Sequence, residues 1–215
     1  LGLFRGAGAS AIPTIPAGLG AAPTATPRGS AAPTTTTNVG PKPSGCPSSA
    51  PAALAKGETR TVTLGTRKGQ IVLQVKADLA PLAAGNFVAL AECGFYNGVV
   101  FHRLVPGFVI QGGDRTGTGT GSPGYTIKDE PVTTAYLRGT LAMARTSAPN
   151  SQGAQFFIVL ADKNSLAQTN TYAIFGSVTA GMDVVDAIAA MPNSGQPSNS
   201  AMDPVAMDTV TVSKP

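Results

Sequence analysis

The stretch FHRLVPGFVIQGGD, residues 101–114, places a guanidinium and a carboxamide among side chains that avoid water. Its other residues are mostly Phe, Leu, Val and Ile, yet Arg103 and Gln111 interrupt the apolar pattern. Arginine is permanently charged and presents several N–H donors, so in a water-poor site it acts as a fixed hydrogen-bond donor. The amide of Gln111 can satisfy and aim that guanidinium. From the residues alone, the pattern fits either a charge placed for chemistry in a water-poor site or an arginine on a barrel edge.

His102 is the only histidine, and its surroundings do not indicate hydrolysis or metal binding. A hydrolytic triad needs a base near a nucleophile and an orienting acid, and the chain has no G-x-S-x-G elbow. We interpret His102 as a partly buried structural donor. One His and two Cys are too few soft ligands for a zinc site. We therefore expect neither a metal nor a cofactor.

A glycine-rich stretch over residues 112–124 contains Gly119, Gly121 and Gly124 in the spacing G-x-G-x-x-G. An expected strand precedes it, as in dinucleotide-binding folds. However, Pro123 and the following YTIKDE are not a helix start, and no βαβ unit surrounds the motif. We interpret the stretch as a surface loop.

Composition excludes several other classes of protein. The chain is 42% hydrophobic and 12% charged, which is enough apolar material for one core. Residues 1–57 hold four basic side chains and no acid, so the remaining 11 bases balance the 11 acids of the folded part. Without a cluster of Lys and Arg on that part, we expect no nucleic-acid binding. No apolar run reaches about 18 residues, so we expect no transmembrane helix.

The composition changes near residue 57, where we place a domain boundary. Residues 1–57 contain nine of the 18 prolines and long Thr, Ala and Ser runs, which predicts a disordered Pro/Thr/Ala-rich tether. Residues 58–215 form the predicted folded domain. The first 20 residues are mildly apolar, and two interpretations stay open: the remnant of an anchor or signal segment, or the end of a disordered tail. Such tethers favour an extracytoplasmic protein, secreted or tethered through the tail, while a cytoplasmic one stays open.

The two cysteines also leave two interpretations open. Cys46 lies in the tether and Cys93 at the end of the first expected helix. In an oxidising compartment they could form a disulfide that ties the tether to the domain. Alternatively they are two unrelated thiols.

Beyond residue 57 the pattern is that of many short strands and two helices. TRTVTLGT and GQIVLQVK alternate around a short turn and predict a β-hairpin. Helical spacing covers residues 80–93, with Pro81 in the first turn and Gly94 as C-cap, and again residues 180–191. Further strands are expected over residues 99–105, 108–111, 139–145, 155–161, 172–179 and 207–213. This pattern is mainly β and favours a closed antiparallel barrel.

Four blocks carry a resemblance to a known family. FYNGVVFHRLVPGFVIQGGD, GTLAMARTSAPNSQGAQFFIVLA and YAIFGSV resemble a cyclophilin-type peptidyl-prolyl cis-trans isomerase of the bacterial subtype, through F-H-R, P-G-F, Q-G-G-D and Q-F-F in that order. The resemblance spans about residues 58–213. It implies a closed eight-stranded antiparallel β-barrel capped by two α-helices, with a peptide groove on one face.

The resemblance also assigns roles to residues of this chain. It implies that Arg103 is catalytic and that Gln111 holds it. It implies that a second set binds the substrate: Phe108, Val109, Ala144, Arg145, Thr146, Gln155, Phe157, Leu166 and Tyr172. The implied partners are proline-containing peptides and unfolded or folding proteins, and we expect a monomer.

The chain departs from the family at the groove rim. Many members have a Trp there, whereas this chain has none and Ser165 occupies or adjoins that place. Losing the indole removes apolar surface and an N–H donor, so we expect cyclosporin-type ligands to bind weakly. Val109 replaces a commoner Met, and Tyr172 stands where many members have His, a change that bacterial members often share.

Two functions of different class remain in view. The first is an isomerase that assists protein folding by accelerating rotation about X-Pro bonds. The second is a non-catalytic proline-peptide-binding or chaperone module that uses the same groove. From composition alone, Arg103 could also be a surface residue on a barrel edge, with Phe108, Phe157 and Leu166 as ordinary core.

Overall fold

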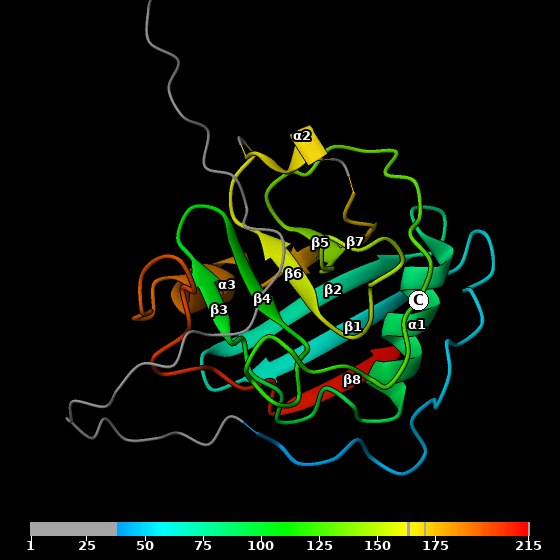
Figure 1. Cartoon of the computed structure of the whole chain (residues 1–215), viewed down its shortest axis with the longest axis horizontal. Helices are drawn as coiled ribbons and strands as arrows, with labels where there is room; N and C mark the ends of the chain where they lie inside the picture. The colour runs from blue at the N-terminus through cyan, green and yellow to red at the C-terminus, as the bar shows by residue number, and fades with distance from the viewer. Residues whose placement is uncertain (1–37, 163, 170, 215) are drawn as a thin grey trace, which may run out of the picture.

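The hairpin predicted by alternation forms the long central strands of the fold, β1 (Thr59–Thr66) and β2 (Gly69–Lys76). The structure is a computed structural model and describes residues 38–162, 164–169 and 171–214. Figure 1 shows these two strands running side by side across the molecule. Every second residue of β2 from Ile71 to Val75 is buried, as its pattern requires.

All eight strands belong to one antiparallel sheet, so the mainly β, eight-stranded architecture is confirmed. The other strands are β3 (Arg103–Val105), β4 (Val109–Gly112), β5 (Thr140–Met143), β6 (Phe156–Val159), β7 (Ile174–Ala180) and β8 (Thr209–Ser213). Their order is β3-β4-β6-β5-β7-β2-β1-β8. The chain thus brings β4 and β6, which are distant in sequence, next to each other.

The sheet is curled but its two edge strands do not pair, so the prediction of a closed barrel goes slightly too far. β3 and β8 are the edges, and the segment before β8 fills the seam between them. Backbone hydrogen bonds join Phe101 N to Val205 O at 2.9 Å and Leu104 N to Asn199 O at 2.9 Å. The sequence could not show this because residues 199–207 pair only through isolated bridges and have no strand periodicity of their own.

Two helices lie on opposite sides of the curled sheet, as Figure 1 shows. α1 (Pro81–Glu92) contacts β7 and β8, while α3 (Met182–Ala189) contacts β2, β3 and β4. Gly94 follows α1 with φ of 77°, and Phe95 N donates to Leu90 O at 2.9 Å, which closes the helix end. A third, short helix that we did not predict is α2 (Leu166–Thr169).

Apolar side chains gather in two clusters, one on each face of the sheet. The interior cluster fills the concave side, and its largest fully buried members include Phe87, Phe95, Tyr96, Phe101, Phe156 and Phe175. The outer cluster consists of Val109, Tyr136, Ala142, Phe157, Val159, Leu166 and Ile174, with partly buried Leu79, Val105, Phe108, Val132, Ala144 and Tyr172 packed on it. Strand alternation separates the two clusters, because successive residues point to opposite faces.

Residues 38–57, which we call the strap, lie against the folded domain. The strap contains no helix or strand, and the predicted tether over residues 1–37 lies outside the described residues. Its Val39, Cys46 and Leu54 pack against the interior cluster. Cys46 and Cys93 are joined by a disulfide. The chain therefore follows the domain surface for some 20 residues before the boundary that composition indicates.

Within the described part of the chain, no helix has the length and apolar character needed to cross a bilayer. The same residues contain no group of three or more His, Cys, Asp or Glu side chains arranged to hold a metal ion.

Candidate active site

Strand register brings the proposed catalytic residues into one row across four strands. Arg103 of β3 is paired with Gln111 of β4, and Gln111 is paired with Phe157 of β6. Phe157 is in turn paired with Ala142 of β5. Paired residues share a face, so a cation, an amide and an aromatic ring lie side by side on the outer surface.

The guanidinium of Arg103 is partly removed from water. Its Nη1 donates to Gln111 Oε1 at 3.4 Å, and the residue is half-buried. Burial lowers the pKa of Arg103 from its usual value, while Tyr172 acts in the opposite direction. Arginine nevertheless stays protonated in proteins, so the site holds a fixed charge with donors left over for a ligand.

Gln111 is itself held by a second glutamine. Gln111 Nε2 donates to Gln155 Oε1 at 3.0 Å. Gln155 Nε2 donates to the carbonyl oxygens of Gly119 at 2.9 Å and Gly121 at 3.1 Å. The glycine-rich stretch is thus a loop, as expected, and its carbonyls fix the orientation of both amides.

An apolar wall stands beside the cation. The rings of Phe157 and Tyr172 meet edge to face, with centroids 5.4 Å apart and planes at 83°. Phe108 and Leu166 pack in the same outer cluster. The Tyr136 hydroxyl donates to Tyr172 O at 2.8 Å and accepts from Tyr172 N at 3.1 Å, which fixes the backbone under that ring. A ring of proline size can pack on such a wall.

The segment after β5 offers an extended backbone along the groove. Ala144 N donates to Gln155 O at 2.9 Å, which continues the β5–β6 pairing by one residue. The Arg145 guanidinium is fixed by Asp129 at 3.0 Å and by Ala148 O at 2.8 Å. No hydrogen bond within the described chain uses the backbone N–H of Arg145, and Thr146 is exposed. An extended peptide could pair here.

The sequence of this chain matches a known protein family. The sequence model described as cyclophilin type peptidyl-prolyl cis-trans isomerase matches residues 61–212. The chain belongs to the cyclophilin family. This identification confirms the resemblance found in the sequence, including its isomerase activity.

Individual cyclophilins agree with the match. A peptidyl-prolyl cis-trans isomerase of Acinetobacter baylyi is 43% identical over 158 residues, covering 70% of this chain and 84% of that protein. One from Helicobacter pylori is 42% identical over 135 residues, covering 61% and 81%.

Solved cyclophilin structures share the fold. A crystal structure of a Cryptosporidium parvum cyclophilin has a TM-score of 0.66 at 30% identity, and covers 73% of this chain and 99% of that one. A second structure of that protein, obtained in the presence of the dipeptide Ala-Pro, has a TM-score of 0.65 at 31% identity and covers 72% and 99%.

The structure gathers the residues assigned from the cyclophilin resemblance on one face, although their roles stay predictions. Phe108, Val109, Ala144, Phe157, Leu166 and Tyr172 all belong to the outer cluster or pack on it. Gln111 and Gln155 are linked to Arg103, as described above. Only Arg145 and Thr146 lie outside this cluster and network, along the exposed segment after Ala144.

Sequence reasoning missed Ala142, Tyr136 and Asp114 as parts of the site. Ala142 could have been found from β5–β6 alternation, whereas Tyr136 lies in a segment without periodicity. The carboxylate of Asp114 organises the loop after β4, because it accepts from Thr118 N at 3.1 Å and Thr116 N at 2.8 Å. Burial alone would raise the pKa of Asp114, but hydrogen bonds from Gly121, Thr116 and Gly119 outweigh it and lower that pKa.

The prediction of His102 as a structural donor is wrong. Its side chain is 7% exposed, and within the described chain neither ring nitrogen has a hydrogen-bond partner. Burial lowers the pKa of His102 to about 4, with Asp114 opposing and Arg103 reinforcing this shift. The ring is therefore neutral near pH 7 and packs beside Arg103.

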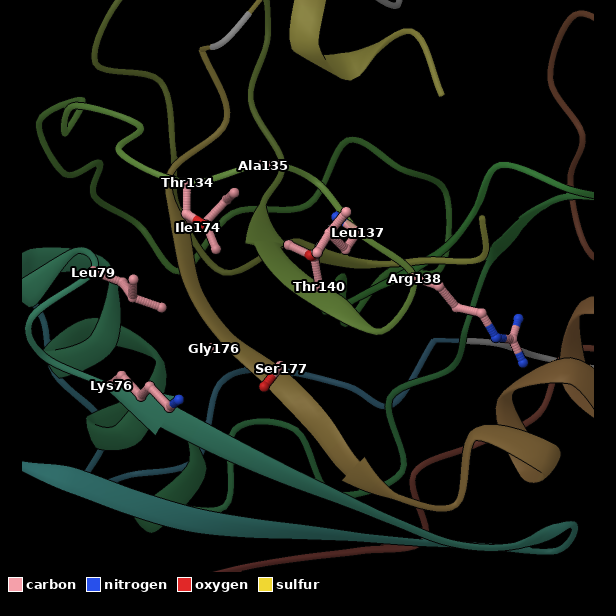
Figure 2. A pocket seen from close by; sticks show the side chains of 10 residues that line it. All are labelled: Lys76, Leu79, Thr134, Ala135, Leu137, Arg138, Thr140, Ile174, Gly176 and Ser177. Atoms are coloured by element: carbon pink, nitrogen blue, oxygen red, sulfur yellow. Dashed lines mark hydrogen bonds between the residues drawn. The ribbon is translucent and has the colours of Figure 1, made fainter. Parts of the chain in front are cut away.

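A surface hollow of about 290 Å³ adjoins the outer cluster on the side away from Arg103. Figure 2 shows Lys76 and Arg138 on its opposite sides, with Ile174, Thr140 and Ser177 between them. The Arg138 guanidinium forms an ion pair with Asp186 and donates a hydrogen bond to Leu160 O at 2.8 Å. Ile174 belongs to both the hollow and the outer cluster, so the apolar face continues beyond the proposed proline wall.

Proposed function

We propose that this isomerase accelerates X-Pro rotation by donating a hydrogen bond from Arg103 to the prolyl nitrogen while the amide is twisted. In the planar amide the nitrogen lone pair is delocalised and accepts poorly. At the twisted geometry the lone pair becomes an acceptor, and a fixed guanidinium binds that state better than either resting isomer. The observation that supports this is the row of Arg103, Gln111 and Phe157 on one face of the sheet.

The energetics require more than the arginine. The rotation barrier is about 18–20 kcal/mol. A ten-thousandfold acceleration needs about 5.5 kcal/mol of selective binding. One charge-assisted hydrogen bond contributes about 1.5–3 kcal/mol. The remainder comes from the apolar wall, where Phe157 and its neighbours hold the proline ring away from water, since low polarity disfavours the charge-separated form of the planar amide.

The proposed substrates are proline-containing peptides within unfolded or folding proteins. The related structure obtained with Ala-Pro supports a dipeptide-sized recognition element. The segment from Ala144 to Thr146 extends the groove for the flanking backbone. The chemistry breaks no covalent bond, so it requires neither metal nor cofactor.

Substitution of Arg103 separates this function from a non-catalytic peptide-binding module. We expect Arg103→Ala to lower kcat/KM for an Ala-Pro peptide by about tenfold to a hundredfold, because one charge-assisted hydrogen bond is lost. Arg103→Lys keeps the charge but not the planar fork of donors, so its kcat/KM should lie between those of the wild type and Arg103→Ala. The readout is protease-coupled isomerisation.

The matched control is Arg67→Ala, which removes an exposed arginine paired with Asp203 at the β1–β2 turn. It should retain the wild-type rate. If Arg103→Ala also isomerises the peptide at the wild-type rate, the catalytic role of Arg103 is refuted. If the wild-type protein binds the peptide without isomerising it, the groove belongs to a binding module instead.

We also propose that the protein works outside the cytoplasm, secreted or tethered through its N-terminal tail. The Cys46–Cys93 disulfide supports this location, because such bonds persist in oxidising compartments. Acid quenching of the source cells followed by thiol alkylation tests it. Alkylated Cys46 and Cys93 in freshly quenched cells would contradict the proposal.

Cyclosporin-type ligands are expected to bind weakly, because no indole stands at the rim near Ser165. Calorimetric titration measures this affinity directly. A nanomolar dissociation constant would refute the expectation.

A further inference from the structure

The strap is fixed to the domain at several points, which its composition does not predict. Cys46 is bonded to Cys93 at the end of α1, and Leu54 N donates to Pro81 O at 3.0 Å. Gly85 on α1 allows close approach of the strap, since a Cβ there would overlap Ala52 O. Contacts of this kind hold the strap backbone in one place along the helix.

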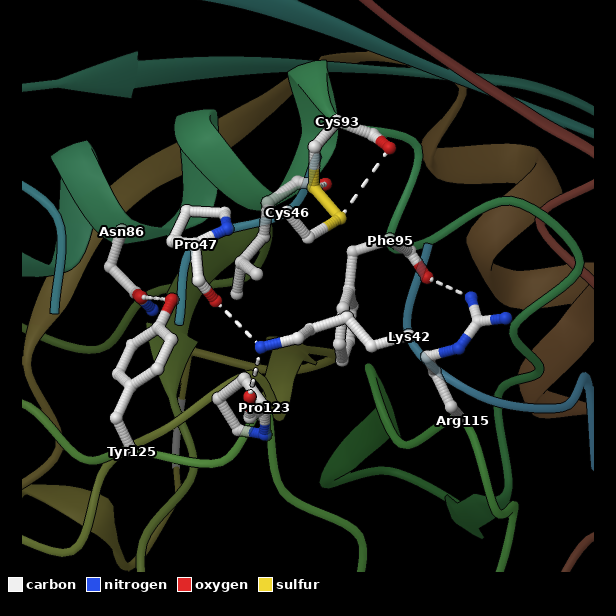
Figure 3. The surroundings of a disulfide bond; sticks show 10 residues. Lys42, Cys46, Pro47, Asn86, Cys93, Phe95, Arg115, Pro123 and Tyr125 are labelled. Carbon is white, nitrogen blue, oxygen red and sulfur yellow. Dashed lines mark hydrogen bonds between the residues drawn. A yellow bond between two sulfur atoms is a disulfide. The ribbon is translucent and has the colours of Figure 1, made fainter. Parts of the chain in front are cut away.

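Lys42 links the strap to the glycine-rich loop. Its ammonium donates to Pro47 O within the strap at 2.7 Å and to Pro123 O in the loop at 2.9 Å. It also lies 6.0 Å from the centroid of the Tyr125 ring. Figure 3 shows the ammonium between the two carbonyl oxygens, below the disulfide. One side chain thus connects two segments 81 residues apart.

Arg115 makes the reciprocal connection, from the loop to the strap. Its guanidinium donates to Val39 O at 2.8 Å, to Gly40 O at 3.2 Å and to Phe95 O at 2.6 Å. The backbone of Arg115 accepts from Val39 N at 3.0 Å. The strap and the loop are therefore held together at both ends of the loop, near Arg115 and near Pro123.

The loop between these two anchors holds the glutamine pair described above. It wraps around Asp114 so tightly that a Cβ on Gly121 would overlap the Asp114 carboxylate. The carbonyls of Gly119 and Gly121 face Gln155 Nε2, so Gln155 must turn its Oε1 toward Gln111. Gln111 then presents its own Oε1 to Arg103. If the loop shifted, either amide could rotate and present an NH2 group to the guanidinium.

We propose that the strap is a positioning element of the active site, and that Lys42 is its positioning residue. Lys42 and Arg115 hold the loop, the loop orients Gln155 and Gln111, and these amides hold the guanidinium of Arg103 at the prolyl nitrogen. This inference rests on the proposed function, in which Arg103 stabilises the twisted amide. It adds a part of the chain beyond the 61–212 family match to the catalytic machinery.

The test replaces Lys42 in the full-length oxidised chain and separates kcat from KM for an Ala-Pro peptide. Lys42→Met should lower kcat about fivefold to tenfold while KM stays within about twofold, because small displacements of a catalytic group act on the transition state. Lys42→Arg, which keeps a cation and several donors, should recover most of kcat. The matched control is Lys56→Met, since Lys56 lies exposed in the same strap and makes no hydrogen bond or ion pair within the described chain. Thermal unfolding confirms that each variant is folded.

A second experiment loosens the strap without changing Lys42. Reduction of the disulfide by dithiothreitol, or the double change Cys46→Ser with Cys93→Ser, should lower kcat in the same direction. The double serine variant should then be insensitive to dithiothreitol. Wild-type kcat in Lys42→Met, or in the reduced and still folded protein, would overturn the inference.

The Arg103→Ala background distinguishes failure of this inference from failure of the proposed function. If the strap acts through Arg103, Lys42→Met should cause no further loss of kcat in that background. An equal fold loss there would show that Lys42 acts by another route and would overturn the inference alone. Full activity of Arg103→Ala by itself would instead refute the proposed function.

Discussion

The interior cluster and the outer cluster share strands β4 to β7 but are covered in different ways. On β6, Phe156 and Ile158 belong to the interior cluster, while Phe157 and Val159 belong to the outer one. The interior cluster is covered by α1 and α3, and its rings pack on one another: Phe87 meets Phe156 edge to face at 5.2 Å. The outer cluster borders instead on Arg103, on the Tyr172 ring and on the exposed segment beyond Ala144.

The difference shows how one alternating pattern can supply both stability and function. Strands that are apolar on both faces bury one face under the helices. The second face must then be covered by other means, and an apolar surface bordered by fixed polar groups is typical of a ligand site. In this protein the border consists of a cation and two amides that the loop after β4 holds in place. Substitutions on either face should therefore separate stability from activity.

The largest loss of unfolding free energy is expected for a substitution in the interior cluster. Phe156→Ala leaves a cavity among Phe87, Tyr96 and Phe101, which all contact its ring. It should lower the free energy of unfolding by about 3–5 kcal/mol. Chemical denaturation measures this loss, and the fraction that remains folded should keep a near-normal kcat. A loss below about 1 kcal/mol would contradict the division into two clusters.

The next effect concerns His102, which is buried beside the groove. The pKa of His102 is about 4 in the folded protein and near the ordinary histidine value of 6.5 in the unfolded chain, so as pH falls the unfolded chain takes up the proton first. The free energy of unfolding should therefore fall by about 2–3 kcal/mol between about pH 7 and about pH 4.5. Denaturant titrations at both values measure the decline.

The control for this pH dependence is His102→Gln, which cannot take up a proton in that range. Its free energy of unfolding should decline less on acidification than that of the wild type. Identical slopes in both proteins would show that other groups, such as Asp114, cause the decline.

A smaller effect is expected on the outer face. Phe157→Ala removes the ring against which the substrate proline is proposed to pack, and should lower kcat/KM about tenfold through lost apolar contact. Its cost in unfolding free energy should be well below that of Phe156→Ala, because the outer cluster borders on solvent. Isomerisation assays and denaturation of the two adjacent variants make the comparison. Equal destabilisation with unchanged activity would make Phe157 ordinary core.

The smallest effect is expected at the rim. Tyr172→Ala removes an edge-to-face contact with Phe157, worth about 0.5–1.5 kcal/mol, and should raise KM by about twofold to tenfold. Tyr172→Phe keeps the ring and should leave KM near the wild-type value. If the phenylalanine variant were as impaired as the alanine variant, the hydroxyl near Arg103 would be the important group.

Local patterns predicted the elements whose partners lie nearby in the chain. The alternation over residues 59–76 gave both strands of the hairpin, and Gly94 correctly marked the end of α1. Elements that depend on distant partners were not accessible. The seam beside β3 depends on residues 199–207, and α2 is only a single short turn.

In the candidate site, too, the residues marked by a local pattern could be predicted, whereas those that depend on distant contacts could not. Arg103 and Gln111 could be selected because polar groups stand out in an apolar strand, and their partnership follows from register once β3 and β4 pair. The role of the strap could not be predicted. Its Pro, Ser and Ala content is that of a disordered segment, and only the three-dimensional contacts of Lys42 and Arg115 show that it is bound. His102 could not be interpreted because composition does not report whether a buried ring finds a partner.

The Cys46–Cys93 bond also determines how the domain would respond to mechanical tension. A pull on the chain N-terminal to the strap is transmitted through the covalent bond to the end of α1, and does not reach β1 directly. Without that bond the same force would peel the chain toward β1, whose neighbours are β2 and β8. The bond thus shields β1 and β2, which lie between the two cysteines, from force that arrives along the polypeptide.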